Sequence, residues 1–353
     1  MLFEGKTVLV TGGTGSLGKV LVRRILSGEQ GTPRKVIVFS RDEAKQHEMR
    51  LSYLSRSVTT DEVIYRNFMQ TLEFRIGDVR DYPAVCSAVR DADIVVNAAA
   101  LKQVPSCEYF PVEAMLTNCQ GATNIVRAIG ENRYPVETVV AVSTDKACKP
   151  VNVMGISKAL QERIFVAANI LNSRTRFIGV RYGNVLASRG SVIPLFHAQI
   201  AAGGPVTITA PEMTRFLLSL DRAVDTIFAA LGNARPGEIF VPIVPSATVE
   251  NIARALIGDA PIETRVIGVR PGEKLHEIMI SEEEIHHCVR RGDWYAIRSM
   301  LPELSGETTE APELQREYSS ADQPMDFPAT VDLLRQHRLL TSDAIQEDGE
   351  LLR

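Results

Sequence analysis

A glycine-rich turn close to the start of the chain constrains the fold more than any other feature. The apolar run TVLV, residues 7–10, is followed by TGGTGSLG, residues 11–18, and then by the helical pattern KVLVRRILSG. A strand, a glycine turn and a helix N-terminus in this order form a cradle for a pyrophosphate, because glycines let the backbone come close and helix amides face the phosphates. The alternative, a glycine-rich surface turn, does not require this order of elements. We therefore expect a dinucleotide to contact Gly12, Thr14, Gly15, Ser16, Leu17 and Gly18.

Strands and helices alternate from this turn to RFIGVRYGNV, residues 176–185. The alternation predicts an α/β fold, namely a Rossmann-type doubly wound parallel sheet with a smaller α/β substrate-binding lobe. A chain of 353 residues, 45% of them hydrophobic, is long enough to bury the cores of both parts. The expected boundaries are residues 1–184 and 211–246 for the cofactor-binding domain, 185–210 and 247–300 for the smaller lobe, and 301–353 for a C-terminal tail.

The tail differs from the rest of the chain in composition. It is acidic, contains prolines and has little periodicity. Such a segment is either an ordered arm on a neighbouring subunit or a partly mobile end, and both alternatives stay open here.

The second expected strand, KVIVFS, ends where a dinucleotide fold selects the ribose of its cofactor. The strand tip carries Ser40 and Arg41, and Lys45 follows closely. Two cations and a hydroxyl suit a 2′-phosphate better than a 2′-hydroxyl, so we expect NADP. Asp42 keeps NAD open as the less favoured cofactor.

The next two strand ends are expected to line the same cofactor. Asp78 and Val79 end the third strand at the adenine, although Asp78 alone suits an ordinary turn equally well. The run DIVVNAAA ends the fourth strand, and Ala98, Ala99 and Ala100 are expected to close over the cofactor.

Composition and charge exclude several classes of protein. A net charge of −4 and a pI of about 6.0 leave no basic footprint for nucleic acid. No apolar run approaches the ~18 residues that span a bilayer, and no signal peptide precedes the first strand. Five scattered cysteines are typical of the cytoplasm, and neither they nor His286 and His287 have metal-ligand spacing. We expect a cytoplasmic protein with no nucleic-acid partner, membrane span or metal.

The stretch VSTDKACKPVNVMGISKALQE, residues 142–162, has the layout of a short-chain dehydrogenase active site. In that superfamily a strand ending in Ser or Thr precedes a helix with Tyr-x-x-x-Lys, which places both side chains on one helix face. Here Lys158 is present, but Met154 stands where the tyrosine belongs, and methionine cannot transfer a proton. The adjacent Asp145 and Lys146 are the nearest acid–base pair, unless they form an ordinary solvated turn.

Eight sequence blocks together resemble the UDP-N-acetylglucosamine 4,6-dehydratases of capsule, O-antigen and flagellin-sugar synthesis. The blocks cover roughly residues 1–285, and the methionine resembles the capsule branch. The resemblance implies a UDP-N-acetylglucosamine or closely related substrate, oxidation at carbon 4, loss of water across carbons 5 and 6, and return of the hydride to carbon 6. Tightly bound NADP is then regenerated in each turnover, and the protein forms a homo-oligomer, a dimer or hexamer. The blocks are TGGTGSLG, FSRDEAKQ, AALKQVPSCEYFP, TNCQGATNIV, VSTDKACKPVNVMGISKA, RYGNVLASRGSVIPLF, PEMTRF and RPGEKLHE.

The resemblance also implies catalytic roles. Related nucleotide-hexose dehydratases end the strand in Thr-Asp-Glu, which suggests Asp145 as the acid at position 6 and Lys146 as the base at carbon 5. A neutral Lys146 needs a lowered pKa, which Lys149, Lys158 or burial could supply. The proton of the 4-hydroxyl goes either to Thr144 within reach of Lys158 or to Lys146. Lys158 is expected to hold the nicotinamide ribose, unless it is an exposed helix lysine, and Tyr182 and Asn184 complete the cofactor contacts.

By the same resemblance the nucleotide-sugar site follows the RYGN strand. Arg215 and Arg270 are expected at the pyrophosphate and Glu273 at a uridine ribose hydroxyl. The loop KQVPSCEYFP resembles the branch that inverts carbon 5, a step that needs a second proton donor. Cys107 is the candidate donor and Lys102 the reserve, with buried packing as the alternative for the thiol. The UDP path is expected to be lined by Asn184, Ser188, Ser191 and Val192.

Two other functions stay in view. A UDP-sugar 4-epimerase or another oxidoreductase on this fold normally relies on the tyrosine that is missing here. A non-catalytic NADP-binding sensor would explain Met154 but not the Asp145–Lys146 pair.

Overall fold

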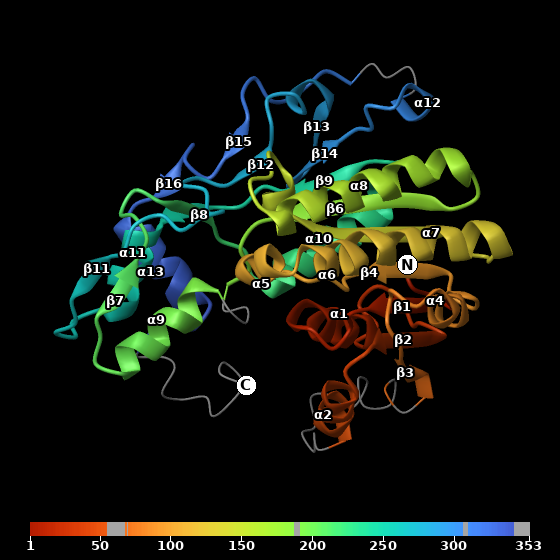
Figure 1. Cartoon of the computed structure of the whole chain (residues 1–353), viewed down its shortest axis with the longest axis horizontal. Helices are drawn as coiled ribbons and strands as arrows, with labels where there is room; N and C mark the ends of the chain where they lie inside the picture. The colour runs from red at the N-terminus through yellow and green to blue at the C-terminus, as the bar shows by residue number, and fades with distance from the viewer. Residues whose placement is uncertain (55–67, 69, 187–190, 306–309, 342–353) are drawn as a thin grey trace.

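The computed structural model describes residues 1–54, 68, 70–186, 191–305 and 310–341. Its centre is one large sheet of nine strands in the order β13-β14-β9-β6-β5-β4-β1-β2-β3 (Figure 1). The seven strands from β3 to β9 run parallel to their neighbours, whereas β14 and β13 are antiparallel. The strands are β1 (Thr7–Thr11), β2 (Lys35–Ser40), β3 (Leu72–Ile76), β4 (Ile94–Asn97), β5 (Thr138–Thr144), β6 (Arg176–Tyr182), β9 (Ile239–Pro242), β13 (Cys288–Arg291) and β14 (Trp294–Ile297).

The strand order 3-2-1-4-5-6 confirms the expected Rossmann-type doubly wound fold. Helices cover both faces because the strands are apolar on both faces. In β1, Val8 and Val10 pack into one core and Leu9 packs into the other, as the alternation of side chains along a strand requires. The first core is covered by α1 (Ser16–Leu26) and α10 (Leu220–Asn233), and the second by α4 (Tyr82–Val89), α7 (Gly121–Asn132) and α8 (Val153–Leu171).

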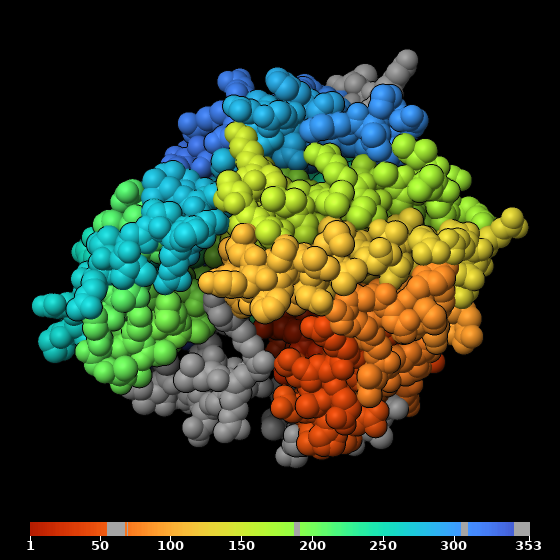
Figure 2. Space-filling model, in the orientation of Figure 1, coloured from red at the N-terminus to blue at the C-terminus, as the bar shows by residue number. Residues whose placement is uncertain are grey.

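A smaller lobe lies beside the carboxyl ends of the parallel strands (Figure 1). The space-filling view shows the surface hollowed between this lobe, in green and cyan, and the red N-terminal region (Figure 2). In open α/β sheets ligands bind at this end of the strands. The lobe contains a sheet of β8 (Thr214–Phe216), β10 (Ser246–Thr248) and β16 (Pro324–Met325), the pair β7 (Val206–Ile208) and β11 (Thr264–Val266), and the helices α9 (Val192–Ala201), α11 (Val249–Ile257) and α13 (Phe327–Gln336).

One hairpin lies outside the lobe to which the sequence assigned it. Residues 288–297 were expected in the smaller lobe, but β13 and β14 extend the large sheet, with Ile297 opposite Ile239 of β9. The reason is burial, because Cys288 and Ala296 lie on the hairpin and are fully buried.

The described part of the C-terminal tail packs on its own chain, which differs from the expected arm or mobile end. Strand β15 (Tyr318–Ser319) pairs with β12 (Ile278–Ile280), and α13 packs against α11. Leu334, Leu339 and Leu340 belong to the core of the smaller lobe, and His197 Nε2 lies 2.8 Å from the Leu339 carbonyl. Residues 306–309 and 342–353 lie outside the described residues. No helix in the described ranges combines the length and apolar character needed to cross a membrane.

Candidate active site

The glycine turn forms a tight cradle between β1 and β4. Gly12 has a φ of +67°, and a Cβ there would lie 2.8 Å from backbone atoms of Ala99. A Cβ on Gly18 would lie 2.5 Å from Gly13, so α1 packs directly on the turn. The N-cap residue of α1, Gly15, makes no side-chain cap, as is usual where phosphate oxygens take the first helical amides. The cradle therefore fits the pyrophosphate of a dinucleotide, and Ala98 and Ala100 lie half-buried beside it.

The polar groups expected at the cofactor ribose meet at the tips of β2 and β3. Ser40 Oγ lies 3.0 Å from Thr14 Oγ1, which joins the strand tip to the glycine turn. Both cations already have carboxylate partners: Lys45 Nζ lies 2.5 Å from Asp42, and an Arg41 nitrogen lies 3.7 Å from Asp78. Arg80 also binds Asp78 at 2.7 Å, while Val79 is buried in the core. This arrangement fits either a 2′-hydroxyl or a 2′-phosphate.

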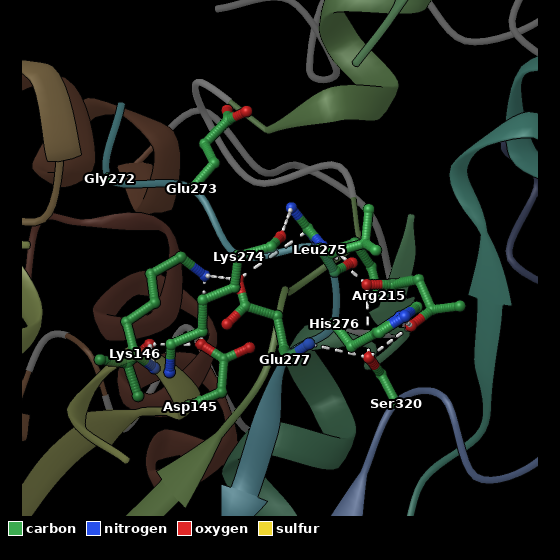
Figure 3. A network of polar contacts seen from close by, with 12 residues as sticks. Asp145, Lys146, Arg215, Gly272, Glu273, Lys274, Leu275, His276, Glu277 and Ser320 are labelled. Carbon is green, nitrogen blue, oxygen red and sulfur yellow. Dashed lines mark hydrogen bonds and ion pairs between the residues drawn. The ribbon is translucent and has the colours of Figure 1, made fainter. Parts of the chain in front are cut away.

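An ion cluster of Asp145, Lys146 and Glu277 lies where β5 ends (Figure 3). Lys146 Nζ lies 3.2 Å from Asp145 Oδ1 and 3.1 Å from Glu277 Oε1. Both carboxylates are buried, with 0% and 2% of their side chains exposed. Thr144 donates a hydrogen bond of 2.9 Å to Asp145 Oδ1. Asp145 Oδ2 and Glu277 Oε2 are buried and have no hydrogen-bond partner within the described ranges.

The charges of this ion cluster determine the direction in which the pKa of Lys146 moves. Burial alone would lower the pKa of Lys146, but the charges of Asp145 and Glu277 outweigh burial and raise it. Lys149 pairs with Glu282 and Glu317. The ion cluster therefore favours the ammonium form of Lys146, and the neutral amine that a base at carbon 5 requires must arise by loss of a proton.

The pKa values of the two carboxyls move in opposite directions. Burial raises the pKa of Asp145, and Glu277 adds to the rise, while Lys146 and Thr144 oppose it. At Glu277 burial also favours the neutral acid, but Lys146 and Arg215 together lower the pKa of this carboxyl. Asp145 is therefore the carboxyl that accepts a proton more readily.

Glu277 was missed in the sequence, although it ends the RPGEKLHE block. Arg215, expected at the pyrophosphate, is found beside it with Nε 3.9 Å from Glu277 Oε1. Its remaining guanidinium nitrogens donate to the carbonyls of Thr214 (2.7 Å), Leu275 (3.2 Å) and Lys274 (3.1 Å). Arg215 therefore ties β8 to the segment that carries Glu277.

Helix α8 carries both Lys158 and Met154, and both residues are buried. Lys158 is buried, and its Nζ donates 2.6 Å hydrogen bonds to the Val142 carbonyl and to Gln161. Burial lowers the pKa of Lys158 to about 8. Met154 packs with Cys107 and Ala114 in a small apolar cluster, as methionine does in irregular cores.

Cys107 lies inside this cluster and is fully buried. Its Sγ lies 3.8 Å from the Leu101 carbonyl, and burial raises the pKa of the thiol. These features favour the packing alternative for Cys107. Lys102, the reserve donor, is exposed on the loop before α5 (Val104–Tyr109). Tyr182, expected at the cofactor, is buried at the end of β6 in the core.

The residues expected along the UDP path fall into two groups. Asn184 Oδ1 and Ser191 Oγ are buried without a hydrogen-bond partner among the described residues, and Val192 begins α9 next to them. Arg270 is exposed, its amide donating to Glu273 Oε2 at 3.4 Å, and Glu273 points away from the ion cluster (Figure 3). Ser188 lies outside the described residues. No group of residues with metal-ligand geometry occurs in the part of the chain that the structure describes.

The chain is similar to several known proteins. The family model described as polysaccharide biosynthesis protein matches residues 8–299. The chain is 43% identical over 310 residues to a UDP-N-acetylglucosamine 4,6-dehydratase (inverting) of Campylobacter jejuni, covering 87% of each chain. It is 44% identical over 301 residues to a UDP-glucose 4-epimerase of Rickettsia bellii, covering 84% of each. The crystal structure of Pen from Bacillus thuringiensis has 32% identity and a TM-score of 0.84, over 96% of this chain and 100% of that one.

Proposed function

Since the chain belongs to the polysaccharide biosynthesis protein family, we propose that it dehydrates UDP-N-acetylglucosamine to a UDP-4-keto-6-deoxy-N-acetylhexosamine with inversion at carbon 5. One observation carries the proposal: the buried Asp145 and the half-buried Lys146 form an ion pair at the end of β5, whereas Met154, at the position of the usual tyrosine, cannot transfer a proton. The reaction is a lyase reaction and an early step in making a deoxy amino sugar for a bacterial surface polysaccharide.

The cofactor proposed for this site is NADP, held by the glycine cradle and by Ser40, Arg41 and Lys45. When bound, it accepts a hydride from carbon 4 of the sugar and returns it to carbon 6. Arg41 is the cation best placed for a 2′-phosphate, because more than half of its side chain is exposed and its contact with Asp78 is long, at 3.7 Å. Lys158 is proposed to contact the nicotinamide ribose.

The acid and the base arise together in one proton transfer. A proton that moves from Lys146 Nζ to Asp145 Oδ1, which lie 3.2 Å apart, leaves a neutral amine and a carboxylic acid. The raised pKa of Asp145 makes this transfer less costly than for an ordinary aspartate. The amine then removes the proton from carbon 5, and Asp145 protonates the 6-hydroxyl as it departs as water. When the hydride adds to carbon 6, carbon 5 takes up a proton on its opposite face, and Lys102 is the proposed donor of that proton.

The proton of the 4-hydroxyl has three candidate acceptors in this site. Thr144 hydrogen-bonds to Asp145 and can relay a proton. Lys146 can accept the proton only as the neutral amine, and it must release that proton before it acts at carbon 5. Lys158 has a pKa of about 8, which is near the range that suits a general base.

The substrate nucleotide is proposed to lie along Asn184, Ser191 and Val192, since the first two offer buried polar atoms without partners in the described residues. Arg270 and Glu273 are proposed to contact the pyrophosphate and the uridine ribose. Both side chains can reach a ligand from the surface of the lobe. Arg215 holds the ion cluster in place. Its Nη2 gives one N–H to the Lys274 carbonyl, so the second N–H of Nη2 is proposed to contact the pyrophosphate.

A mass measurement tests the function. Purified protein incubated with UDP-N-acetylglucosamine should form a product lighter by one water. An isobaric product would instead identify a 4-epimerase, the activity named for the Rickettsia bellii relative. Absence of any product would point to a sensor.

We also propose a cytoplasmic homo-oligomer. All five cysteines are free thiols, which suits the cytoplasm. Helices α6 (Pro111–Met115) and α8 pack together and expose Val112, Met115, Ile156 and Leu160. An apolar face of this kind is typical of a subunit interface. Sedimentation should show a dimer or hexamer, and Ile156→Asp should dissociate it.

A further inference from the structure

Glu277 contacts the proposed base but has no step in the reaction described above. Its carboxylate is 2% exposed and its Oε1 lies 3.1 Å from Lys146 Nζ. A buried carboxylate is costly unless charged partners compensate for lost water. Here Lys146 lies on one side and Arg215 Nε lies 3.9 Å away on the other.

The charges of the four side chains in this site sum to zero. Asp145 and Glu277 are negative, while Lys146 and Arg215 are positive. If a proton passes from Lys146 to Asp145, both residues become neutral. The negative charge of Glu277 and the positive charge of Arg215 still cancel. Glu277 Oε1 can then accept a hydrogen bond from the neutral amine of Lys146.

We propose that Glu277 is the positioning residue of Lys146: it holds the Lys146 nitrogen beside Asp145 and keeps the site neutral while their shared proton moves. The proposal rests on the dehydratase function above. It adds a third member, distant in sequence, to the Asp145–Lys146 pair.

The backbone of Glu277 is held rigidly, as a positioning role requires. Its amide donates a 2.9 Å hydrogen bond to Ser320 Oγ, from the C-terminal tail. Ser320 Oγ lies 2.7 Å from Thr214 Oγ1, which lies 2.8 Å from His276 Nδ1 (Figure 3). Glu277 is therefore fixed from β8, from its own strand segment and from the tail.

The charge of Glu277 has a measurable effect on pH dependence. The charged groups that act on it are Lys146, Arg215, Lys274 and Asp145, and His276 is the preceding residue in the chain. Glu277 raises the pKa of both Lys146 and Asp145. Removing its charge should lower both pKa values and move the pH profile of kcat to lower pH by about 1 to 3 units. A change that only loosened the structure would reduce kcat without moving the profile.

The test compares the holoenzyme with Glu277→Gln and Glu277→Asp, using UDP-N-acetylglucosamine as substrate. The glutamine variant should lose about 100-fold in kcat, with little change in KM, and its profile should move to lower pH. The aspartate variant keeps the charge but shortens the side chain, so its kcat should fall while its profile stays in place. Glu282→Gln, a surface carboxylate paired with Lys149, is the matched control.

Two results would overturn the proposal: wild-type kcat in both variants, or a loss of kcat in Glu277→Gln with an unmoved profile. If the glutamine variant does not fold, as circular dichroism reports, the aspartate variant decides. In the aspartate variant kcat should fall while KM, the pH profile and the urea midpoint of unfolding stay at wild-type values. An unchanged kcat, or a fall in kcat that comes with a lower unfolding midpoint, rejects the proposal. Failure of the wild-type enzyme to remove water would reject the dehydratase function instead.

Discussion

Lys146 Nζ and Glu277 Oε1 lie 3.1 Å apart, although one residue follows β5 and the other precedes β12, much later in the chain. The contact joins the end of β5 to the segment that leads into β12. It also means that the resting lysine carries its proton, so a base can form only when that proton moves.

The first prediction concerns the Asp145–Lys146 pair. Lys146→Ala should abolish both water loss and exchange of hydrogen 5 with solvent, because no base remains at carbon 5. Asp145→Asn should also abolish both, because Lys146 then lacks the carboxylate that takes up its proton. Each variant should lose at least ~100-fold, measured by mass spectrometry of the product and by NMR in deuterium oxide. Near wild-type turnover of Lys146→Ala would remove Lys146 from the mechanism.

The second prediction concerns the cofactor. Arg41→Ala should weaken NADP binding far more than NAD binding, because a charge-assisted phosphate contact contributes ~1.5 to 3 kcal/mol. Titration calorimetry with both dinucleotides measures this difference. Arg90→Ala, which removes another surface arginine, should leave both affinities unchanged. Equal losses for the two cofactors in Arg41→Ala would contradict NADP specificity.

The third prediction concerns the inverted carbon. The native product formed in deuterium oxide should carry deuterium at carbon 5 and have the L-arabino configuration. Because Cys107 is packed in an apolar cluster, Cys107→Ala should still invert, whereas Lys102→Ala should slow inversion. A D-xylo product from the native enzyme would refute inversion, and loss of inversion only in Cys107→Ala would restore the thiol as the donor.

The fourth prediction follows from the buried Lys158, whose pKa is about 8 in the folded protein and 10.5 in an unperturbed lysine. Between these values the unfolded chain binds more protons, so this residue makes stability rise as pH increases from about 8 to about 10.5. The unfolding free energy of the wild type minus that of Lys158→Met should therefore rise through this window, by at most ~3 kcal/mol. Urea unfolding at several pH values measures this difference. A difference that does not change with pH would show that the pKa of Lys158 is not lowered in the folded protein.

The fifth prediction concerns the tail. Ser320→Ala should cost ~1 to 3 kcal/mol of unfolding free energy, because it leaves the buried Glu277 amide without its acceptor. Ser173→Ala, at an exposed serine, is the control.

Truncation after Met300 removes the leucines of α13 and its flank from the core of the smaller lobe and should abolish activity. An active truncated enzyme would show that the tail is dispensable.

Local patterns in the sequence predicted the parts of the molecule that depend on neighbouring residues. The glycine cradle, the parallel sheet and the strand-end position of Asp145 each follow from a short segment. The β13–β14 hairpin also had a local signal, because Gly292-Asp293 is a two-residue turn between its strands, and it was overlooked.

Glu277 had no such signal. The RPGEKLHE block holds two glutamates, and only the folded chain shows that Glu277 faces Lys146 while Glu273 points away. The direction of the Lys146 pKa could not be read from the sequence for the same reason, since it depends on this distant charge.

The hydrogen bond from the Glu277 amide to Ser320 affects the order in which the site can be completed during synthesis. The cofactor cradle emerges first and can fold while the rest of the chain is still being made, because domains fold from the N-terminus as they are translated. The segment around Ser320 is made near the end, and only then is the strand that carries Glu277 held in place. A ribosome-bound chain can therefore bind its dinucleotide before it can carry out the dehydration.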